Sequence, residues 1–318
     1  MKLVIQIPCL NEEKDIAQTL RDLPKTIEGV DTIEVLIIDD GSEDNTSLVA
    51  REQGVKHFVR FAKRRGLAKA FNAGLDAALR LGADIIVNTD ADGQYKGEDI
   101  PRLIKPVLEG KADIVIGNRD IDNVRQFSWI KKKLQRLGTW VVRNISGVTL
   151  SDATTGFRAY SKEAALRLNI ISNYTYTLES IIQAEHKNLV IDNIIISTNE
   201  VKRPSRLFKS IPEYIKRSIV TIIRVYAMFN PMGVFMRLGS LVSLAGFLLG
   251  CRFLYYYLLG HGDGKLQSLL LAAVLLIIGF QIFVIGLLAD LVSANRRLIE
   301  DVLLRIKRSE LKDKGPLQ

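Results

Sequence analysis

Two patterns of apolar residues follow one another along the chain. In roughly the first 200 residues, short runs rich in β-branched residues alternate with segments of helical periodicity. The runs are KLVIQIP, IEVLIID, HFVRF, DIIVNTD and DIVIGNR, and helical patterns cover 13–23, 45–53 and 67–81. Strands alternating with helices predict a mostly parallel sheet covered on both faces. We therefore expect an α/β domain of the nucleotide-binding type over residues 1–208.

The second pattern is a pair of long apolar runs. Residues 238–259 are interrupted only by Arg252, and residues 269–288 carry no charge. A helix needs about 20 apolar residues to cross a bilayer, and core helices of soluble proteins rarely contain such a run. With only a short loop, GHGDGK, between the runs, the pattern predicts a transmembrane hairpin over residues 232–292. A pair of buried core helices is the alternative.

Basic residues flank this hairpin on both sides. The formal net charge is +9, from 44 Lys and Arg against 35 Asp and Glu, which suits nucleic acid or an anionic membrane. The positive charges cluster beside the apolar runs, at Lys202, Arg203, Arg206, Lys209, Lys216, Arg217, Arg224, Arg296, Arg297, Arg305, Lys307 and Arg308. This clustering favours a membrane partner and no nucleic acid. By the positive-inside rule, the domain and the basic segment 293–318 should lie on the cytoplasmic side of an inner membrane.

A basic amphipathic segment precedes the hairpin. Residues 209–231 place isoleucines at spacings of three and four, with basic residues elsewhere on the helical wheel. Such a helix can lie in the headgroup plane of a membrane. The alternative is an ordinary surface helix packed on the domain. We expect the tail after Ser309 to be frayed.

Polar residues follow four of the predicted strands, in the motifs PCLNEE, DDGS, DADGQ and GNR. The ligand crevice of an open parallel sheet lies at the carboxyl ends of its strands. Asp90 and Asp92 are two residues apart, with Gln94 next, and two close carboxylates repel each other unless a cation lies between them. Mg²⁺ takes one or two carboxylates and fills its shell with phosphates and water. We therefore predict a metal–diphosphate site; a helix cap or a solvated turn is the alternative.

A second acidic pair, Asp39 and Asp40, ends another apolar strand. Carboxylates there suit hydrogen bonds from a ribose hydroxyl or a base N–H. The alternative is a plain helix N-cap by Ser42, which would explain Ser42 but not the two carboxylates of Asp39 and Asp40. The segment RRGLAKAFNAGL adds positive charge and two glycines beside this site.

The order of these motifs resembles a known family. PCLNEE, DDGSEDNT, RRGLAKAFNAGL, DADGQ, GNR and DATTGFRAYSKE follow one another, over roughly residues 1–210, as in the inverting GT-A glycosyltransferases of family 2. With the amphipathic helix and the hairpin, the chain is similar to bacterial polyprenyl-phosphate glycosyltransferases, relatives of dolichol-phosphate mannose synthase. The resemblance implies transfer of a sugar from a nucleoside diphosphate to polyprenyl (undecaprenyl) phosphate, for cell-envelope glycan modification.

The resemblance also implies a role for particular residues, a metal and a donor. The nucleotide would contact Pro8, Asn11, Glu12, Asp39 and Asp40, and Mg²⁺ or Mn²⁺ would bind Asp90, Asp92 and Gln94. It favours UDP-glucose as the donor, with GDP-mannose and UDP-N-acetylhexosamine as alternatives. It leaves open a homo-oligomer such as a tetramer.

The chemistry of a phosphate acceptor points to arginines. A lipid monophosphate is mostly ionised near neutral pH, so deprotonating it is a small problem and bringing two anions together is the large one. Candidate arginines are Arg119, Arg136, Arg143 and Arg203, whereas Lys131, Lys132 and Lys133 suit attraction to the membrane. Asp152 is the main candidate for a carboxylate at the reacting centre, where it could hold a sugar hydroxyl or orient an arginine. Glu179 is the second candidate.

The chain departs from the family in one motif, and two rival functions are the alternatives to a lipid-phosphate transferase. The family often carries Arg-x-x-Gly-x-Ser-Lys before the membrane segment, but this chain reads RPSRLFK, with Arg206 and Phe208 at the Gly and Ser positions. A processive polysaccharide synthase would need a Gln-x-x-Arg-Trp segment, which QRLGTW does not match. A non-catalytic nucleotide-sugar-binding scaffold would not need both acidic pairs together with Asp152.

Overall fold

The computed structural model describes residues 1–119, 152–171, 176–199, 230–260 and 266–313, with residues 220, 224 and 226–228. The chain divides into two compact units. The first comprises Met1–Ile223 and Leu303–Gln318, and the second comprises Arg224–Val302. The end of the chain thus belongs with the N-terminal domain.

The described part of the first unit is built on a seven-stranded sheet in the order β3-β2-β1-β4-β6-β5-β7. Its strands are β1 (Lys2–Cys9), β2 (Thr32–Asp39), β3 (His57–Arg60), β4 (Ile85–Asn88), β5 (Ile114–Asn118), β6 (Arg158–Ser161) and β7 (Ile191–Ile195). All neighbouring pairs are parallel except those of β6, which runs antiparallel to β4 and β5. The mostly parallel sheet and its five predicted strands are confirmed.

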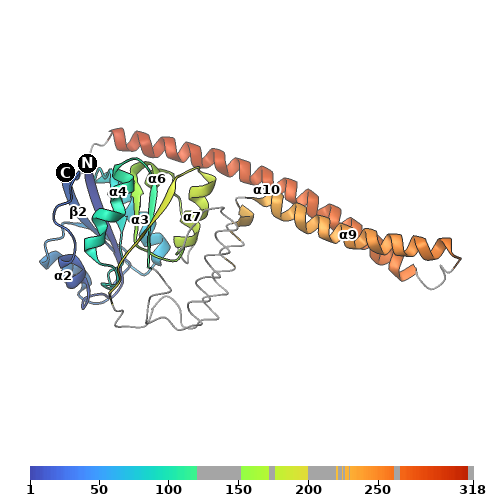
Figure 1. Ribbon diagram of the computed structural model, residues 1–318, viewed down its shortest axis with the longest axis horizontal. Helices are drawn as coiled ribbons and strands as arrows, with labels where there is room; N and C mark the ends of the chain where they lie inside the picture. The colour runs from blue at the N-terminus through green and yellow to red at the C-terminus, as the bar shows by residue number, and fades with distance from the viewer. Residues whose placement is uncertain are drawn as a thin grey trace. The chain divides into compact units, whose positions relative to one another are not determined.

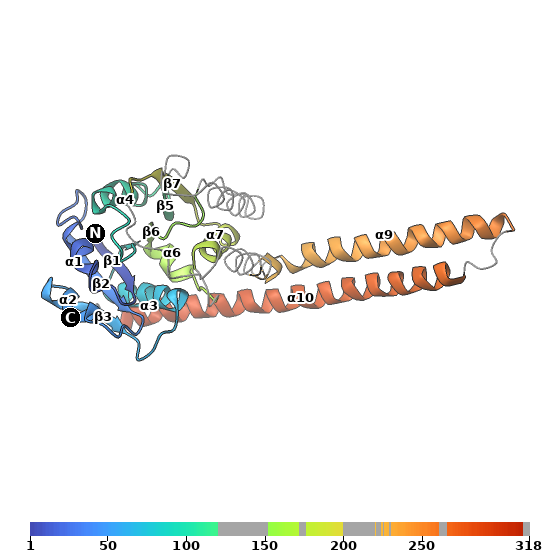
Figure 2. The ribbon, with the colours of Figure 1, turned by 90° about the horizontal axis from the view of Figure 1, so that it is seen from below.

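Helices cover both faces of this sheet, as predicted (Figure 1). They are α1 (Ile16–Arg21), α2 (Thr46–Glu52), α3 (Leu67–Arg80), the short 3₁₀ turn η1 (Gly97–Asp99), α4 (Ile100–Leu108), α6 (Lys162–Arg167) and α7 (Thr177–His186). Figure 2 shows α3 and α4 on opposite sides of the sheet. Successive strand residues point to opposite faces, so Ile86 packs with the α3 cluster while Ile85 and Val87 pack with the α4 cluster.

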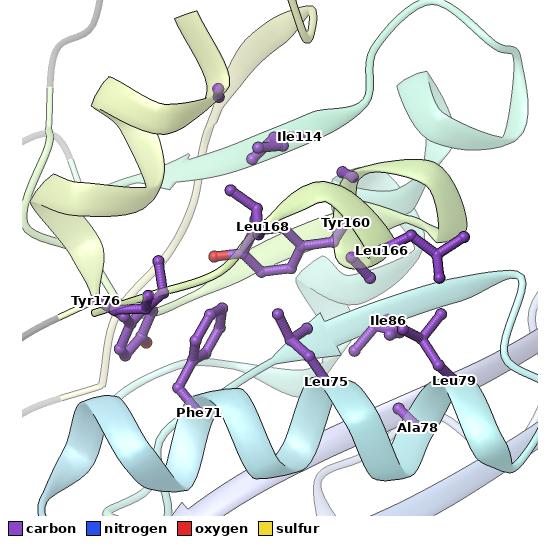
Figure 3. Packing of buried hydrophobic residues seen from close by; sticks show 14 of the residues in the cluster. Phe71, Leu75, Ala78, Leu79, Ile86, Ile114, Tyr160, Leu166, Leu168 and Tyr176 are labelled. Carbon is purple, nitrogen blue, oxygen red and sulfur yellow. The ribbon is translucent and has the colours of Figure 1, made fainter. Parts of the chain in front are cut away.

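The α3 cluster is drawn in Figure 3. Phe71, Leu75 and Ala78 lie on one face of α3, at spacings of four and three residues, and contact the strands above them. The Phe71 ring stacks on the Tyr176 ring, with 3.9 Å between their centroids and 3° between their planes. This stack anchors Tyr176, the N-cap residue of α7, against α3.

The second unit consists largely of α9 (Pro231–Leu258) and the apolar part, up to Val302, of α10 (Leu266–Asp313). Both helices are long and apolar enough to cross a membrane. They approach closely at small residues: a Cβ on Gly246 would lie 3.0 Å from the Ala272 carbonyl oxygen. Large apolar side chains point outward, including Leu241 at 68% exposure and Phe280 at 67%. The predicted hairpin of apolar helices is confirmed, and this exposure argues against buried core helices.

The final turns of α10, from Leu303 on, belong to the first unit and pack within it. Leu304 and Leu311 contact the α3 cluster. The Lys307 ammonium lies 2.9 Å from Asp76, and the Arg308 guanidinium lies 2.7 Å from Glu163. The prediction of a frayed tail after Ser309 is therefore wrong for residues 310–313, which continue the helix. The predicted interfacial helix, 209–231, lies mostly outside the described residues.

Candidate active site

The carboxyl ends of β1, β2 and β4 lie side by side, because these strands are adjacent and parallel. Asn11 and Glu12 follow β1, Asp39 ends β2 and Asp40 comes directly after it, and Asp90 follows β4. β5 runs in the same direction as β4 on the other side of β6, so its carboxyl end lies at the same edge of the sheet. The charges of Glu12, Asp92 and Arg119 all reach Asp90 and influence its pKa. The structure thus brings the predicted strand ends together at one edge of the sheet.

A cavity of about 720 Å³ opens beside β1, β2 and β3. It is lined by Leu10, Asn11, Gly41, Ser42, Glu43, Arg60, Phe61, Ala62, Lys63 and Arg64. Its volume lies within the roughly 300–1,000 Å³ that small-molecule sites occupy. Pro8 is buried within β1 and supports this edge without lining the cavity.

The loop after β1 is tied to the loop after β2. Asn11 adopts a left-handed backbone conformation (φ 56°), which asparagine tolerates better than most residues. Its N–H donates to the Ser42 hydroxyl at 3.0 Å, and its side-chain oxygen accepts from the Glu43 N–H at 2.9 Å. Gly41 has φ 82°, and a Cβ there would lie 2.8 Å from the backbone nitrogen of Arg64. These contacts shape one wall of the cavity.

Asp39 and Asp40 are buried and bonded to the protein. Asp39 accepts from the Ser42 N–H at 2.7 Å and from the Ser47 hydroxyl at 2.5 Å. Asp40 accepts from the Arg65 N–H at 2.7 Å and the Gly66 N–H at 2.9 Å. Both carboxylates therefore organise the loops around the cavity.

The N-cap alternative for Ser42 is wrong. Asn45 occupies the N-cap position of α2, and its side chain makes no capping hydrogen bond. The Ser42 hydroxyl instead accepts from the Asn11 N–H.

The acidic pair at the end of β4 has the electrostatics of a cation site. Burial and the neighbouring charge of Asp92 raise the pKa of Asp90 to about 7, although Arg119 and a hydrogen bond from Tyr95 act against that rise. A carboxyl group in this environment gains from a divalent cation that removes the repulsion. The Gln94 N–H donates to Asp92 at 3.1 Å and orients that carboxylate.

The donor set fits Mg²⁺ or Mn²⁺ completed by a substrate. No group of three His, Cys, Asp or Glu side chains that could hold a metal is found among the residues that the structure describes. Two carboxylates and an amide suit a hard cation that also takes phosphate oxygens and water. Asp90, Asp92 and Gln94 would hold such an ion.

Sequence reasoning missed a buried polar network behind Asp90. The Asn88 side chain accepts from Gln6 at 2.9 Å, and it donates to the Gly156 carbonyl and the Tyr176 hydroxyl, both at 2.8 Å. The Tyr95 hydroxyl accepts from the Gly156 N–H at 3.2 Å. The available signal was Gln6 and Asn88 themselves, because polar residues inside apolar strands need partners.

Arg119 and Asp152 form a buried ion pair. The Arg119 Nε lies 2.7 Å from Asp152 Oδ2, its Nη2 lies 3.2 Å from Oδ1, and Nη2 also donates to the Thr154 hydroxyl at 2.8 Å. Burial alone would raise the pKa of Asp152, but the Arg119 guanidinium holds that pKa below its ordinary value. Asp152 therefore favours its ionised form and holds Arg119 in place, and its role at the reacting centre stays a prediction.

The loop that carries Asp152 is held from inside by Arg158, which is fully buried. Its guanidinium donates to the carbonyls of Ala153 and Thr155, both at 2.9 Å, and to the Thr177 carbonyl at 2.9 Å. Arg158 thereby fixes the loop against the first turn of α7.

Glu179, the second candidate carboxylate, has no exposed surface. It accepts from the Ile171 N–H at 2.9 Å and from Gln183 at 3.0 Å. A substrate would therefore have no direct access to it. The candidates Arg136, Arg143 and Arg203, and the lysines 131–133, lie outside the described residues.

Two transferases are similar to this chain in sequence. A transferase of Methanococcus voltae, named UDP-N-acetylglucosamine–dolichyl-phosphate N-acetylglucosaminyltransferase, is 31% identical over 60% of this chain and 83% of its own length. An undecaprenyl-phosphate 4-deoxy-4-formamido-L-arabinose transferase of Proteus mirabilis is 25% identical over 96% of this chain and 91% of its own. The second match includes the apolar helices.

A solved structure shows the same fold. Glucosyl-3-phosphoglycerate synthase from Mycobacterium tuberculosis, in complex with Mn²⁺, UDP-glucose and phosphoglyceric acid, matches with a TM-score of 0.57 at 21% identity. The match covers 71% of this chain and 80% of that one. The model of the family described as glycosyl transferase family 2 matches residues 4–168, which include both acidic pairs and the Arg119–Asp152 pair. The chain therefore belongs to glycosyl transferase family 2 and is a GT-A glycosyltransferase.

Proposed function

We propose that this enzyme transfers a hexose from a nucleoside diphosphate sugar to the phosphate of a polyprenyl lipid, with inversion at the anomeric carbon. The observation that carries the proposal is the buried Arg119–Asp152 pair, whose positive member lies close enough to Asp90 to influence its pKa. The two apolar helices supply the means to meet a lipid acceptor. The product, a polyprenyl-phosphate sugar, would serve cell-envelope glycan modification.

The acceptor chemistry fits a site without a general base. An oxygen of the lipid phosphate attacks the anomeric carbon, and the bond from that carbon to the diphosphate oxygen breaks. The electron pair leaves with the nucleoside diphosphate, and no proton has to move because the phosphate is already ionised near pH 7. Arg119, held in place by Asp152, reduces the repulsion between the two anions.

The donor side of the site is the cavity beside β1 to β3. Asn11 lines it, Glu12 adjoins it, and Asp39 and Asp40 hold its loops. Mg²⁺ or Mn²⁺ bound by Asp90, Asp92 and Gln94 would supply positive charge to the departing diphosphate. UDP-glucose is the proposed donor, and GDP-mannose and UDP-N-acetylhexosamine are the alternatives.

We also propose that the protein lies in an inner membrane. The basic residues on both sides of the apolar helices support a catalytic domain and C-terminus on the cytoplasmic side of an inner membrane, against anionic lipid. Arg136 and Arg203 are proposed to contact the lipid phosphate. A homo-oligomer, such as a tetramer, remains part of the proposal.

A lipid-extraction assay tests the proposed function. The purified protein in detergent is incubated with polyprenyl phosphate, Mn²⁺ and one radiolabelled donor at a time: UDP-glucose, GDP-mannose or UDP-N-acetylglucosamine. We expect an organic-extractable, mild-acid-labile product with one donor, lost with chelator and with Asp92→Asn. Label in an aqueous polymer would indicate a polysaccharide synthase, and bound donor without product would indicate a scaffold.

A further inference from the structure

We propose that Tyr95 is a positioning residue of the cation site, whose hydroxyl orients Asp90. This inference rests on the proposed binding of Mg²⁺ or Mn²⁺ by Asp90 and Asp92. Tyr95 directly follows Gln94, and its side chain is only 5% exposed. The ring stacks on Phe157, with 5.0 Å between centroids and 9° between planes. Because the ring is buried and stacked, the position of the Tyr95 hydroxyl is fixed.

The hydrogen bonds around this hydroxyl determine where its proton points. The Gly156 N–H, which can only donate, lies 3.2 Å from the Tyr95 oxygen. The Thr155 hydroxyl lies 3.3 Å away, and it accepts from the Phe157 N–H at 3.3 Å, so its own proton is available to Tyr95. The Tyr95 oxygen thus accepts from both neighbours. Its single proton is left for an acceptor, and the Asp90 carboxylate lies against the same Gly156 backbone that contacts the Tyr95 hydroxyl.

The position of Asp90 agrees with this arrangement. A Cβ on Gly156 would lie 3.0 Å from Asp90 Oδ1 and 2.9 Å from the Tyr176 hydroxyl, so the carboxylate packs against the backbone at Gly156. The absence of a side chain at Gly156 leaves room for Asp90 beside Tyr95. Groups that hold metal-binding side chains typically change metal affinity by about 10- to 100-fold when they are removed.

The same hydroxyl connects the cation site with the loop that orients Arg119. That loop begins at Asp152, which binds Arg119, and continues to Thr155 and Gly156, which both donate to Tyr95. The carboxylate that would face the donor diphosphate and the arginine proposed to face the acceptor are therefore linked through one oxygen atom.

Mn²⁺ binding to the full chain tests this inference without turnover. The purified protein in detergent, with UDP and no sugar donor, is titrated with Mn²⁺, and free Mn²⁺ is measured by electron paramagnetic resonance. We expect Tyr95→Phe to raise the Kd for Mn²⁺ about 10-fold or more. Thr155→Val is the matched control, because it removes a hydrogen bond from the same loop but leaves the bond to Asp90, and we expect less than about a twofold change.

Each outcome has a defined meaning. Affinity of Tyr95→Phe within about twofold of the wild type, or an equal loss in Thr155→Val, would overturn the positioning role. An absence of Mn²⁺ binding by the wild-type chain would overturn the cation site itself, and this inference with it. If Tyr95→Phe does not fold, Tyr95→Phe combined with Thr155→Val is compared with Thr155→Val alone, since losing both partners of a buried hydrogen bond disturbs folding less than losing one.

Discussion

The Arg119–Asp152 pair gives the sharpest prediction, because stability and catalysis should respond to it differently. Asp152→Leu removes a carboxylate whose side chain is fully buried and leaves Arg119, whose side chain is 8% exposed, without that partner. The Thr154 hydroxyl, 2.8 Å from Arg119, compensates only in part. Breaking a buried ion pair from one side destabilises a protein by about 3–5 kcal/mol.

This loss converts into a measurable change in melting temperature. For a domain of this size, 1 kcal/mol shifts the Tm by about 2–4 °C, so Asp152→Leu should lower it by roughly 6–20 °C. Thermal unfolding of the purified protein in detergent, followed by circular dichroism, measures the shift. The double variant Arg119→Met with Asp152→Leu should recover at least about half of it, because replacing both members of a buried pair with apolar residues is often neutral.

Transfer activity should not recover with stability. We expect no lipid-linked product from the double variant, because Arg119 is absent from the site. A double variant that is no more stable than Asp152→Leu would refute the ion-pair argument, and a stable double variant with wild-type transfer would refute the role of Arg119 in the reaction.

The contribution of the pair to stability should also be constant at mildly acidic pH. The pKa of Asp152 lies below its ordinary value of 3.8 because of Arg119, despite its burial. A lowered pKa contributes stability that is fully present above the ordinary value and is lost as the pH falls through the folded value. The destabilisation by Asp152→Leu should therefore be equal at pH 5 and pH 6, where Asp152 is ionised and Asp90, with a pKa of about 7, is still mostly protonated.

Three further predictions concern the cation site and α10. The pKa of Asp90 is raised from 3.8 to about 7, so the metal-free protein should lose stability as the pH rises from about 4 to 7. Asp90→Asn should flatten that pH dependence when it is measured by thermal unfolding. The affinity for Mn²⁺ should fall below pH 7, because protons compete with the cation for Asp90. Gly156→Ala should weaken Mn²⁺ binding in the same titration, because its methyl group would lie 3.0 Å from the Asp90 oxygen. Arg308→Glu places a negative charge beside Glu163, and it should lower the free energy of unfolding by only about 1 kcal/mol and speed hydrogen exchange in residues 303–313. The control Arg305→Glu, at an exposed position, should leave that exchange unchanged.

Local patterns were sufficient for the elements and for the edge of the site. The five apolar runs identified β1 to β5, because a strand rich in apolar and β-branched residues can be recognised from its own sequence. β6 and β7 escaped this reasoning. β6, with the sequence RAYS, is short and contains a buried arginine, and it pairs antiparallel between two parallel neighbours. Only its neighbours make those four residues a central strand.

The polar partners required the tertiary structure. Asp90 and Asp92 were found from a spacing of two residues, but Asp152 meets Arg119 across 33 positions and Gly156 meets Tyr95 across 61. The apolar run of α10 predicted a membrane helix, while its last turns pack on a surface that includes Asp76 and Glu163. Apolar periodicity is a property of neighbouring residues and can be read along the chain. A hydrogen-bond partner is chosen by proximity in space, and only the folded sheet creates that proximity.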